Sequence, residues 1–335
     1  MINKLQGLGV LFLASTPLLM PAEKPKDQKT GIKTPGIQIP IARLKAEQEF
    51  PITPGARWLA VTAQVVIAPG KAENSIARLD AKENKAGDPI TGFGQPCAGA
   101  VEAFKSWWIA NCTPGTLVRM DGKDGKVITA ITTGLAKIPN GIAASADSVW
   151  VLSDTKTTLT RIDPDSNKVV SELRLPAGCS GLLAAEGALW VPCPAENRLL
   201  RINTVNNQVE NRIEVSAQPS AVAAGEGSIW VLCRKEGKVE RIDPKTNKVA
   251  KTIELNVPDA EGAIAVGGGS VWVTQTGFPL TRIDPVTDKE RVAQQFSGEG
   301  GGAVQFGFGS VLLVNSKQGT LWKLDPKRIA ATFAE

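Results

Sequence analysis

The chain of 335 residues carries 38 Lys and Arg against 33 Asp and Glu, and it contains neither His nor Tyr. Apolar residues make up 42% and charged residues 21%, a composition typical of a soluble globular protein and not of a membrane or disordered one. Residues 1–33 contribute +3 of the net charge of +5, so the rest of the chain is nearly neutral. We therefore predict no nucleic-acid partner.

The N-terminus has the pattern of a secretory signal. Lys4 precedes a mostly apolar stretch of 14 residues, from Gly7 to Met20, which is too short to span a bilayer comfortably. We predict a signal peptide over residues 1–22, cleaved after Ala22, with an uncleaved signal anchor as the alternative. Residues 23–40, rich in Lys and Pro, are expected to form a flexible leader. The mature protein is expected in the periplasm or outside the cell, with no membrane span.

A tripeptide of the type Arg-Ile-Asp recurs seven times at intervals of 40 to 42 residues. In five repeats a Trp precedes it by 10 or 11 residues. A period near 40 with short, β-branched segments is typical of a β-propeller, in which each repeat forms one blade. We predict an all-β fold over residues 41–335, a seven-bladed β-propeller of four-stranded antiparallel blades, with eight blades as the alternative. The first residues of the seven tripeptides are Arg78, Arg119, Arg161, Arg201, Arg241, Arg282 and Lys323.

One repeat, residues 218–256, shows how a blade should fold. Four segments have strand character, separated by Gly-rich or Asp-Pro turns. The Asp of each repeat is expected to cap the turn between the third and fourth strands. The Trp and Arg of a repeat should lie opposite each other across the hairpin of the second and third strands, as a cation–π pair. The expected strands are residues 220–224, 228–233, 238–243 and 248–255.

The closure of the ring leaves a choice. Residues 328–333 align with the fourth strand of the other repeats, so we expect the last blade to be completed from the C-terminal side. Residues 36–50 are then left over. They either add an outer strand to a blade or close the ring by pairing with the final blade.

The cysteines follow the same repeat geometry. Cys97 and Cys112 are placed symmetrically about one turn between the first and second strands, and Cys179 and Cys193 about another. Opposed positions in an antiparallel hairpin are close enough for a disulfide, and an exported chain is oxidised. We predict two disulfides, Cys97–Cys112 and Cys179–Cys193. Cys233 is predicted to be a free thiol, because the position opposite it holds proline.

The segment from Gly227 to Val249 reads Gly-Ser-Ile-Trp-Val, then Arg-Ile-Asp-Pro-Lys-Thr-Asn-Lys-Val. This pattern resembles the YVTN-type and streptogramin (virginiamycin) B lyase-like bacterial β-propellers, over about residues 55–335. The resemblance implies the propeller fold. For the lyases it also implies an elimination that opens a cyclic depsipeptide with a magnesium ion and a histidine base. No position of this chain matches that histidine.

In a propeller of this topology, ligands are expected at the channel mouth, where the loops joining the fourth strand to the next blade and the second strand to the third meet. Positions 22 residues before each landmark should line it, with Glu261 replacing Ala260 in the sixth repeat: Ala56, Cys97, Pro139, Cys179, Pro219, Ala260 and Gly301. The polar sector of the mouth supplies our candidate ligand-binding residues: Arg234, Lys235, Asp259, Glu261, Gln275, Glu299 and Asn315. Glu261 and Glu299 are the candidate ligands for Mg²⁺ or Ca²⁺, unless these carboxylates form a solvated rim.

Two functions remain open. The first is a non-catalytic, monomeric binding protein with no cofactor, which holds a protein or a small molecule at the channel face. The second is a lyase-like or metal-dependent hydrolytic enzyme that uses the acidic residues of the mouth. We favour the first, because no catalytic residue can be assigned in a chain without His, Tyr or a paired nucleophile and base.

Overall fold

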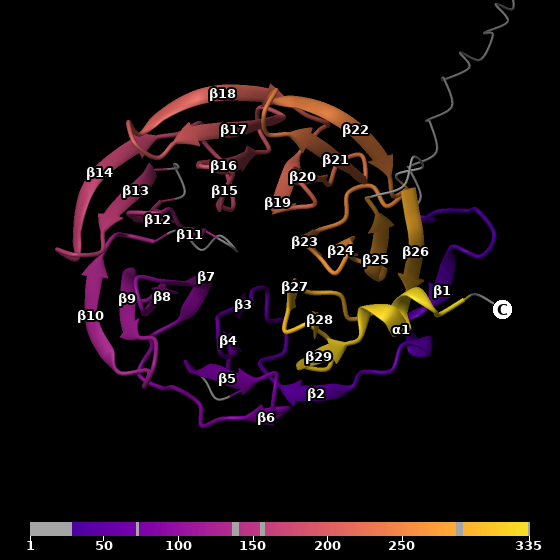
Figure 1. Cartoon of the computed structure of the whole chain (residues 1–335), viewed down its shortest axis with the longest axis horizontal. Coiled ribbons are helices and arrows are strands. Elements are labelled where there is room, and N and C mark those ends of the chain that lie inside the picture. The colour runs from indigo at the N-terminus through magenta and orange to yellow at the C-terminus, as the bar shows by residue number, and fades with distance from the viewer. Residues whose placement is uncertain (1–28, 72–73, 136–140, 155–157, 286–290, 334–335) are drawn as a thin grey trace, which may run out of the picture.

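The computed structural model describes residues 29–71, 74–135, 141–154, 158–285 and 291–333. Over these residues, seven small β-sheets are arranged as a ring around a central opening (Figure 1). The predicted seven-bladed β-propeller of four-stranded antiparallel blades is thus confirmed. Within the described part of the chain, no helix is both long and apolar enough to cross a membrane.

In blades one to six, the strands leave the channel in chain order, so that the first strand of each blade lies innermost (Figure 1). Blade one contains β3 (Ala60–Val61), β4 (Val66–Pro69), β5 (Ile76–Asp80) and β6 (Lys85–Ala86). Blade two contains β7 (Pro96–Ala103), β8 (Ser106–Asn111), β9 (Thr116–Asp121) and β10 (Val127–Thr132). Blade three contains β11 (Ile142–Ala144), β12 (Val149–Leu152), β13 (Thr158–Asp163) and β14 (Lys168–Arg174).

The remaining blades continue the ring. Blade four contains β15 (Leu183–Ala185), β16 (Ala188–Cys193), β17 (Arg198–Asn203) and β18 (Gln208–Glu214). Blade five contains β19 (Pro219–Gly225), β20 (Ser228–Cys233), β21 (Lys238–Asp243) and β22 (Lys248–Glu254), within a residue of the predicted bounds. Blade six contains β23 (Gly262–Gly267), β24 (Ser270–Gln275), β25 (Phe278–Asp284) and β26 (Arg291–Ser297). Blade seven contains β27 (Val304–Gly307), β28 (Ser310–Asn315) and β29 (Thr320–Leu324).

The Asp of the repeat caps a turn, as predicted. In blade five, Asp243 accepts hydrogen bonds from the backbone N–H of Lys245 and the hydroxyl of Thr246, at 2.8 and 3.0 Å. The Lys245 N–H bond contributes most to holding the pKa of Asp243 below its ordinary value. Asn247 then turns the chain with a positive φ of 57°, a conformation that Asn adopts more readily than most residues.

In blades two to five, the Trp and Arg of a repeat also form the predicted cation–π pair. Trp150 lies directly opposite Arg161 in the ladder of β12 and β13. The Arg161 guanidinium carbon lies 5.2 Å from the centre of the indole ring, within the range of a cation–π contact. The indole is buried between blades, so its apolar surface contributes to the core while the guanidinium covers its face.

The same Arg joins neighbouring blades. Arg161 donates to the side-chain oxygen of Asn207, in the last turn of blade four, at 3.0 Å. Arg201 makes the corresponding bond to Asn247 of blade five, at 2.9 Å. Lys323 of blade seven reaches Asn84 of blade one at 2.9 Å, so the same bond spans the closure of the ring. We call this contact the inter-blade latch.

A double-mutant cycle on Arg161→Ala and Asn207→Gly should measure one latch. Glycine keeps the positive φ of 59° at position 207, so the second change removes little but the amide. We expect a coupling energy of about 1 to 2 kcal/mol in urea denaturation, because the two groups share a charge-assisted hydrogen bond. Asn247→Gly, whose partner is Arg201, is the matched control and should be additive with Arg161→Ala. If the stability losses of Arg161→Ala and Asn207→Gly are also additive, this inter-blade latch contributes nothing to the free energy of unfolding.

The ring is closed by the N-terminal segment. Strand β2 (Gln48–Pro51) pairs antiparallel with β29 and supplies the outer strand of blade seven. Both alternatives for residues 36–50 are therefore confirmed: β2 closes the ring on the final blade, and residues 38–40 add an outer strand to blade six. The expectation that residues 328–333 form this strand is wrong, because Asp325 caps a short helix, α1 (Pro326–Ala330), by accepting from the Lys327 N–H at 2.8 Å.

The preceding residues pack on blade six, so the prediction of a flexible leader is wrong for its described part. Strand β1 (Gln38–Pro40) pairs in parallel with β26 as a fifth strand, and a 3-10 helix, η1 (Ile41–Arg43), follows it. Gly31, with a φ of +66°, donates its N–H to Asn256, and a Cβ there would lie 2.5 Å from the Phe278 ring. The predicted signal peptide, residues 1–22, lies outside the described residues.

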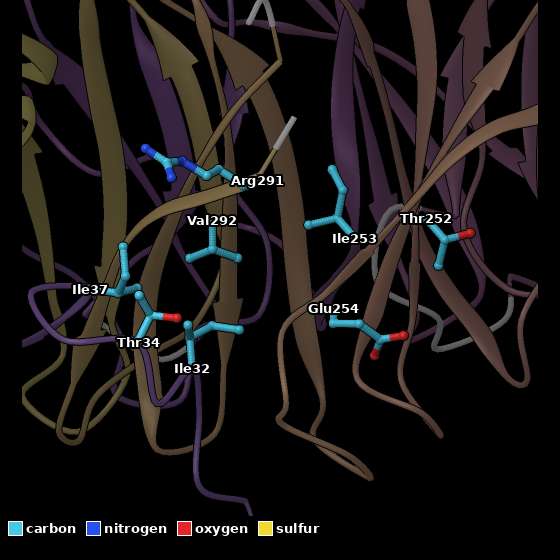
Figure 2. A pocket seen from close by; sticks show the side chains of 8 residues that line it. All are labelled: Ile32, Thr34, Ile37, Thr252, Ile253, Glu254, Arg291 and Val292. Carbon is cyan, nitrogen blue, oxygen red and sulfur yellow. The ribbon is translucent and has the colours of Figure 1, made fainter. Parts of the chain in front are cut away.

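A groove of about 230 Å³ runs beside this segment, between the outer strands of blades five and six. Figure 2 shows Ile32 and Ile37 of the N-terminal segment on one side of the groove and Ile253 of β22 on the other. The N-terminal segment thus covers apolar surface that a four-stranded blade six would expose.

The cysteines pair as predicted. Cys97 is bonded to Cys112 and Cys179 to Cys193, each pair within the hairpin of the first two strands of its blade. Cys233 is a free, buried thiol at the end of β20. Its burial raises the pKa of the thiol well above its ordinary value, which disfavours the reactive thiolate form.

Candidate functional site

A cavity of about 410 Å³ opens at the channel mouth. It is built from the two sets of loops that the sequence pattern indicated, and its walls are mostly Gly, Ala, Ser and Thr. Ala56 and Gly301 line it as expected, whereas Ala260 is buried and Glu261 takes its place. Pro139 lies outside the described residues. The small side chains leave the mouth open, so a ligand could approach the backbone closely.

Glu261 lies between two arginines at one side of the cavity. Its carboxylate is 3.3 Å from Nη1 of Arg57 and 3.6 Å from Nη1 of Arg234. Arg57 comes from the segment between β2 and β3, and Arg234 from the turn that follows β20, so distant parts of the chain meet on one carboxylate. Arg234 is held in turn by Gln218, whose side-chain oxygen accepts from Nε at 3.1 Å. These three are the charged residues of the described lining.

The other predicted carboxylates of the mouth each have a cation of their own. Lys235 contacts Asp259 at 3.1 Å, and Lys317 forms an ion pair with Glu299. The hydrogen bond and charge of Lys317 lower the pKa of Glu299. In the part of the chain that the structure describes, no three His, Cys, Asp or Glu side chains are grouped to hold a metal ion. Glu261 and Glu299 are thus each paired with basic side chains of the protein.

Two of the predicted ligand-binding residues, Gln275 and Asn315, are buried. Gln275 is buried and donates to the backbone oxygen of Val257 at 3.1 Å, while its own side-chain oxygen has no partner among the described residues. Asn315 is buried and accepts from the Gln318 N–H at 3.1 Å, which stabilises the turn after β28. Both are the last residue of the second strand of their blade, β24 and β28 respectively, and their side chains are buried.

Sequence reasoning missed Arg57 and the hydroxyl residues of the lining. Arg57 directly follows Ala56, an expected mouth position. This adjacency in the sequence was the signal that could have identified Arg57 as a lining residue. The hydroxyls lie one residue beyond an expected position or at the start of a turn, where the pattern does not distinguish an exposed Ser from a buried one. They are Ser180, Ser220, Thr276 and Ser316.

The ring of blades and its mouth cavity define the molecule as a seven-bladed β-propeller. No family model matches the chain, and no curated protein matches its sequence. Among solved structures, it is similar to selenomethionine-substituted virginiamycin B lyase from Staphylococcus aureus, at a TM-score of 0.70 and 17% identity, over 83% of this chain and 98% of that one. A streptogramin B lyase structure gives a TM-score of 0.70 and 18% identity, over 83% and 96%.

A third similar structure is a catalytically inactive His-to-Ala variant of the Staphylococcus aureus virginiamycin B lyase with quinupristin, at a TM-score of 0.68, 18% identity, and coverage of 83% and 98%. The structure of U3-55K is also similar, at a TM-score of 0.66 and 9% identity, over 84% of this chain and 100% of that one. At these identities the likeness concerns the fold. The predicted resemblance to streptogramin B lyase-like propellers is confirmed at that level.

Proposed function

We propose that this protein is an exported, non-catalytic β-propeller that binds a small molecule, or a short segment of a partner protein, in its mouth cavity. The observation that carries the proposal is the cavity itself. It has a volume of about 410 Å³, is lined mostly by small side chains, and carries the charged residues Arg57, Arg234 and Glu261 on one side. Its volume lies within the range of small-molecule sites, which combine an open, largely preformed surface with a few fixed polar groups. The propeller scaffold holds these groups on neighbouring blades.

Export is supported by the two disulfides, which persist in oxidising compartments and are rare in the cytosol. The signal-like pattern of residues 1–22 points the same way. We therefore place the binding activity in the periplasm or outside the cell.

A binding role is favoured over catalysis because the acidic residues of the mouth are ion-paired with basic side chains and the chain contains no His. Elimination and hydrolysis near neutral pH need a base whose pKa is close to the working pH, and this chain has no His. Glu299 has a lowered pKa beside Lys317, which makes it a weaker base, and Glu261 lies between two guanidinium groups. The lyases of similar fold include a variant inactivated by loss of a histidine, a residue type that this chain lacks.

The experiment is a thermal melt of the exported chain against a panel of small carboxylates, amines, sugars and short peptides, with Mg²⁺ and Ca²⁺ as separate additions. A ligand at one hundred times its Kd should add about 2.7 kcal/mol to the free energy of unfolding. Ser180→Trp places a large ring on the cavity wall and should abolish the shift. The matched control, Lys245→Trp, adds the same ring to an exposed turn between β21 and β22 and should retain it.

Two results would contradict the proposal. A ligand that stabilises the Ser180→Trp variant as strongly as the unaltered protein binds somewhere other than the mouth cavity. A shift with Mg²⁺ or Ca²⁺ that disappears in Glu261→Gln, accompanied by turnover of any member of the panel, would establish the metal-dependent enzyme instead.

A further inference from the structure

We infer that the mouth cavity recognises a carboxylate group of its ligand, which Arg57 and Arg234 bind in the place now held by Glu261. This inference rests on the proposed function, because it assigns a ligand class to the same cavity. Glu261 is then an internal occupant that the ligand displaces, and not a residue that binds the ligand.

The first argument is the convergence of two guanidinium groups on one carboxylate. Arg57 and Arg234 contact different oxygens of Glu261, Oε2 and Oε1 respectively, so the arrangement already binds a carboxylate from both sides. The described lining carries two cations and one anion, which leaves an excess of positive charge. Planar guanidinium groups match carboxylates in shape and charge, and they are well suited to hold an anionic ligand here.

The second argument is that Glu261 is held weakly. Its side chain is 63% exposed, and exposed ion pairs stabilise proteins by about 0 to 1 kcal/mol. The separations of 3.3 and 3.6 Å exceed the roughly 2.7 to 2.9 Å of a strong charge-assisted hydrogen bond. A ligand carboxylate that approaches either arginine more closely can therefore replace Glu261 at little cost.

The third argument is that Arg234 is positioned before any ligand arrives. Its side-chain Nε donates to the side-chain oxygen of Gln218, and its backbone N–H donates to the backbone oxygen of Gln218 at 3.0 Å. The backbone oxygen of Arg234 accepts from the Asp259 N–H at 2.8 Å. A fixed arginine loses less conformational entropy on binding. The adjoining wall consists of Gly262, Ala263 and Gly301, so a ligand of about dipeptide size fits beside it.

The test is isothermal titration calorimetry with the acidic dipeptide N-acetyl-Gly-Glu and, as its neutral counterpart, N-acetyl-Gly-Gln-amide. We expect Arg57→Gln and Arg234→Gln each to weaken binding of the acid at least about tenfold. Glu261→Gln should tighten it at least about threefold, because the internal competitor is gone. Glu299→Gln is the matched control: it removes a carboxylate that pairs with Lys317 and does not line the cavity, and it should leave the affinity unchanged. Circular dichroism melts verify that each variant is folded.

The opposite signs at Glu261 and the arginines distinguish this inference from its alternatives. Weaker binding in Glu261→Gln, equal binding of the neutral dipeptide, or no binding at all even in Glu261→Gln would each overturn it. If other ligands still bind and Ser180→Trp abolishes that binding, the proposed function stands while the carboxylate inference fails. If the acid binds equally well to Ser180→Trp, both fail, because the mouth cavity is then not the site.

Discussion

Replacement of Phe50 by Ala is expected to lower the free energy of unfolding by about 3 to 5 kcal/mol, the usual cost of emptying a buried aromatic position. Phe50 is 2% exposed and lies in β2, opposite Leu321 of β29. It packs in a cluster that joins blade seven to blade one, with Leu59 and Val66 among its members. The cavity left by Ala would therefore weaken the contact that closes the ring. Urea denaturation followed by tryptophan fluorescence measures the loss.

Phe333→Ala is the matched control for this prediction. The sequence pattern favoured the C-terminal tail as the closing strand, yet Phe333 is 73% exposed, beyond α1. Its removal should change the stability by no more than about 0.5 kcal/mol, as for other exposed positions. Should Phe333→Ala prove as costly as Phe50→Ala, the ring would be closed by the C-terminal tail and not by β2.

Loss of the disulfide in blade four is the second large effect that we expect. The double variant Cys179→Ala/Cys193→Ala removes a crosslink with a sequence separation of 14 residues, which the chain-entropy model values at about 3 kcal/mol. The crosslink acts mainly on the unfolded chain, because it limits the conformations that the open hairpin can reach. Urea denaturation under non-reducing conditions compares the double variant with the unaltered protein.

Cys233→Ala is the control, because Cys233 ends β20 of blade five as Cys193 ends β16 of blade four. It is equally buried but has no disulfide, so its replacement measures the loss of a packed sulfur alone. The double variant should cost about 3 kcal/mol more than twice the cost of Cys233→Ala. An equal cost per sulfur would mean that the crosslink itself adds no stability.

The parts of the fold that the sequence predicted are those made by neighbouring residues. A hairpin brings together residues at equal distances from its turn, so the pairing of Trp150 with Arg161 and of Cys179 with Cys193 follows from counting. The Asp243 turn is more local still, because it depends on hydrogen bonds to residues two and three positions on. Such features repeat with the blade and need no knowledge of the rest of the chain.

The candidate site could be predicted in position but not in its pairings. The repeat placed Ala56, Glu261 and Gly301 at the wall of the mouth, but Cys97, Cys179 and Pro219, which were also expected there, do not line the cavity. It could not show that Arg57, 204 residues away, approaches the carboxylate of Glu261. Nor could it show that the Asn315 side chain accepts a hydrogen bond within the turn after β28. The Arg57 contact depends on a segment outside blade six, which the repeat pattern does not describe, whereas the Asn315 bond is a local contact with a residue three positions on.

The sequence by itself predicted seven blades, with eight as the alternative, together with the strand bounds of blade five, the turns and the two disulfides. Strands, turns and these disulfides arise from contacts within one repeat of about 40 residues. Only the tertiary structure decided which segment closes the ring. Residues 48–51 pair with β29 and bury Phe50, whereas residues 326–330 form α1 and Phe333 beyond it stays exposed. The tertiary structure likewise decided the ion pairs of the mouth, because the ring brings Arg57 and Arg234 to the carboxylate of Glu261 from separate parts of the chain.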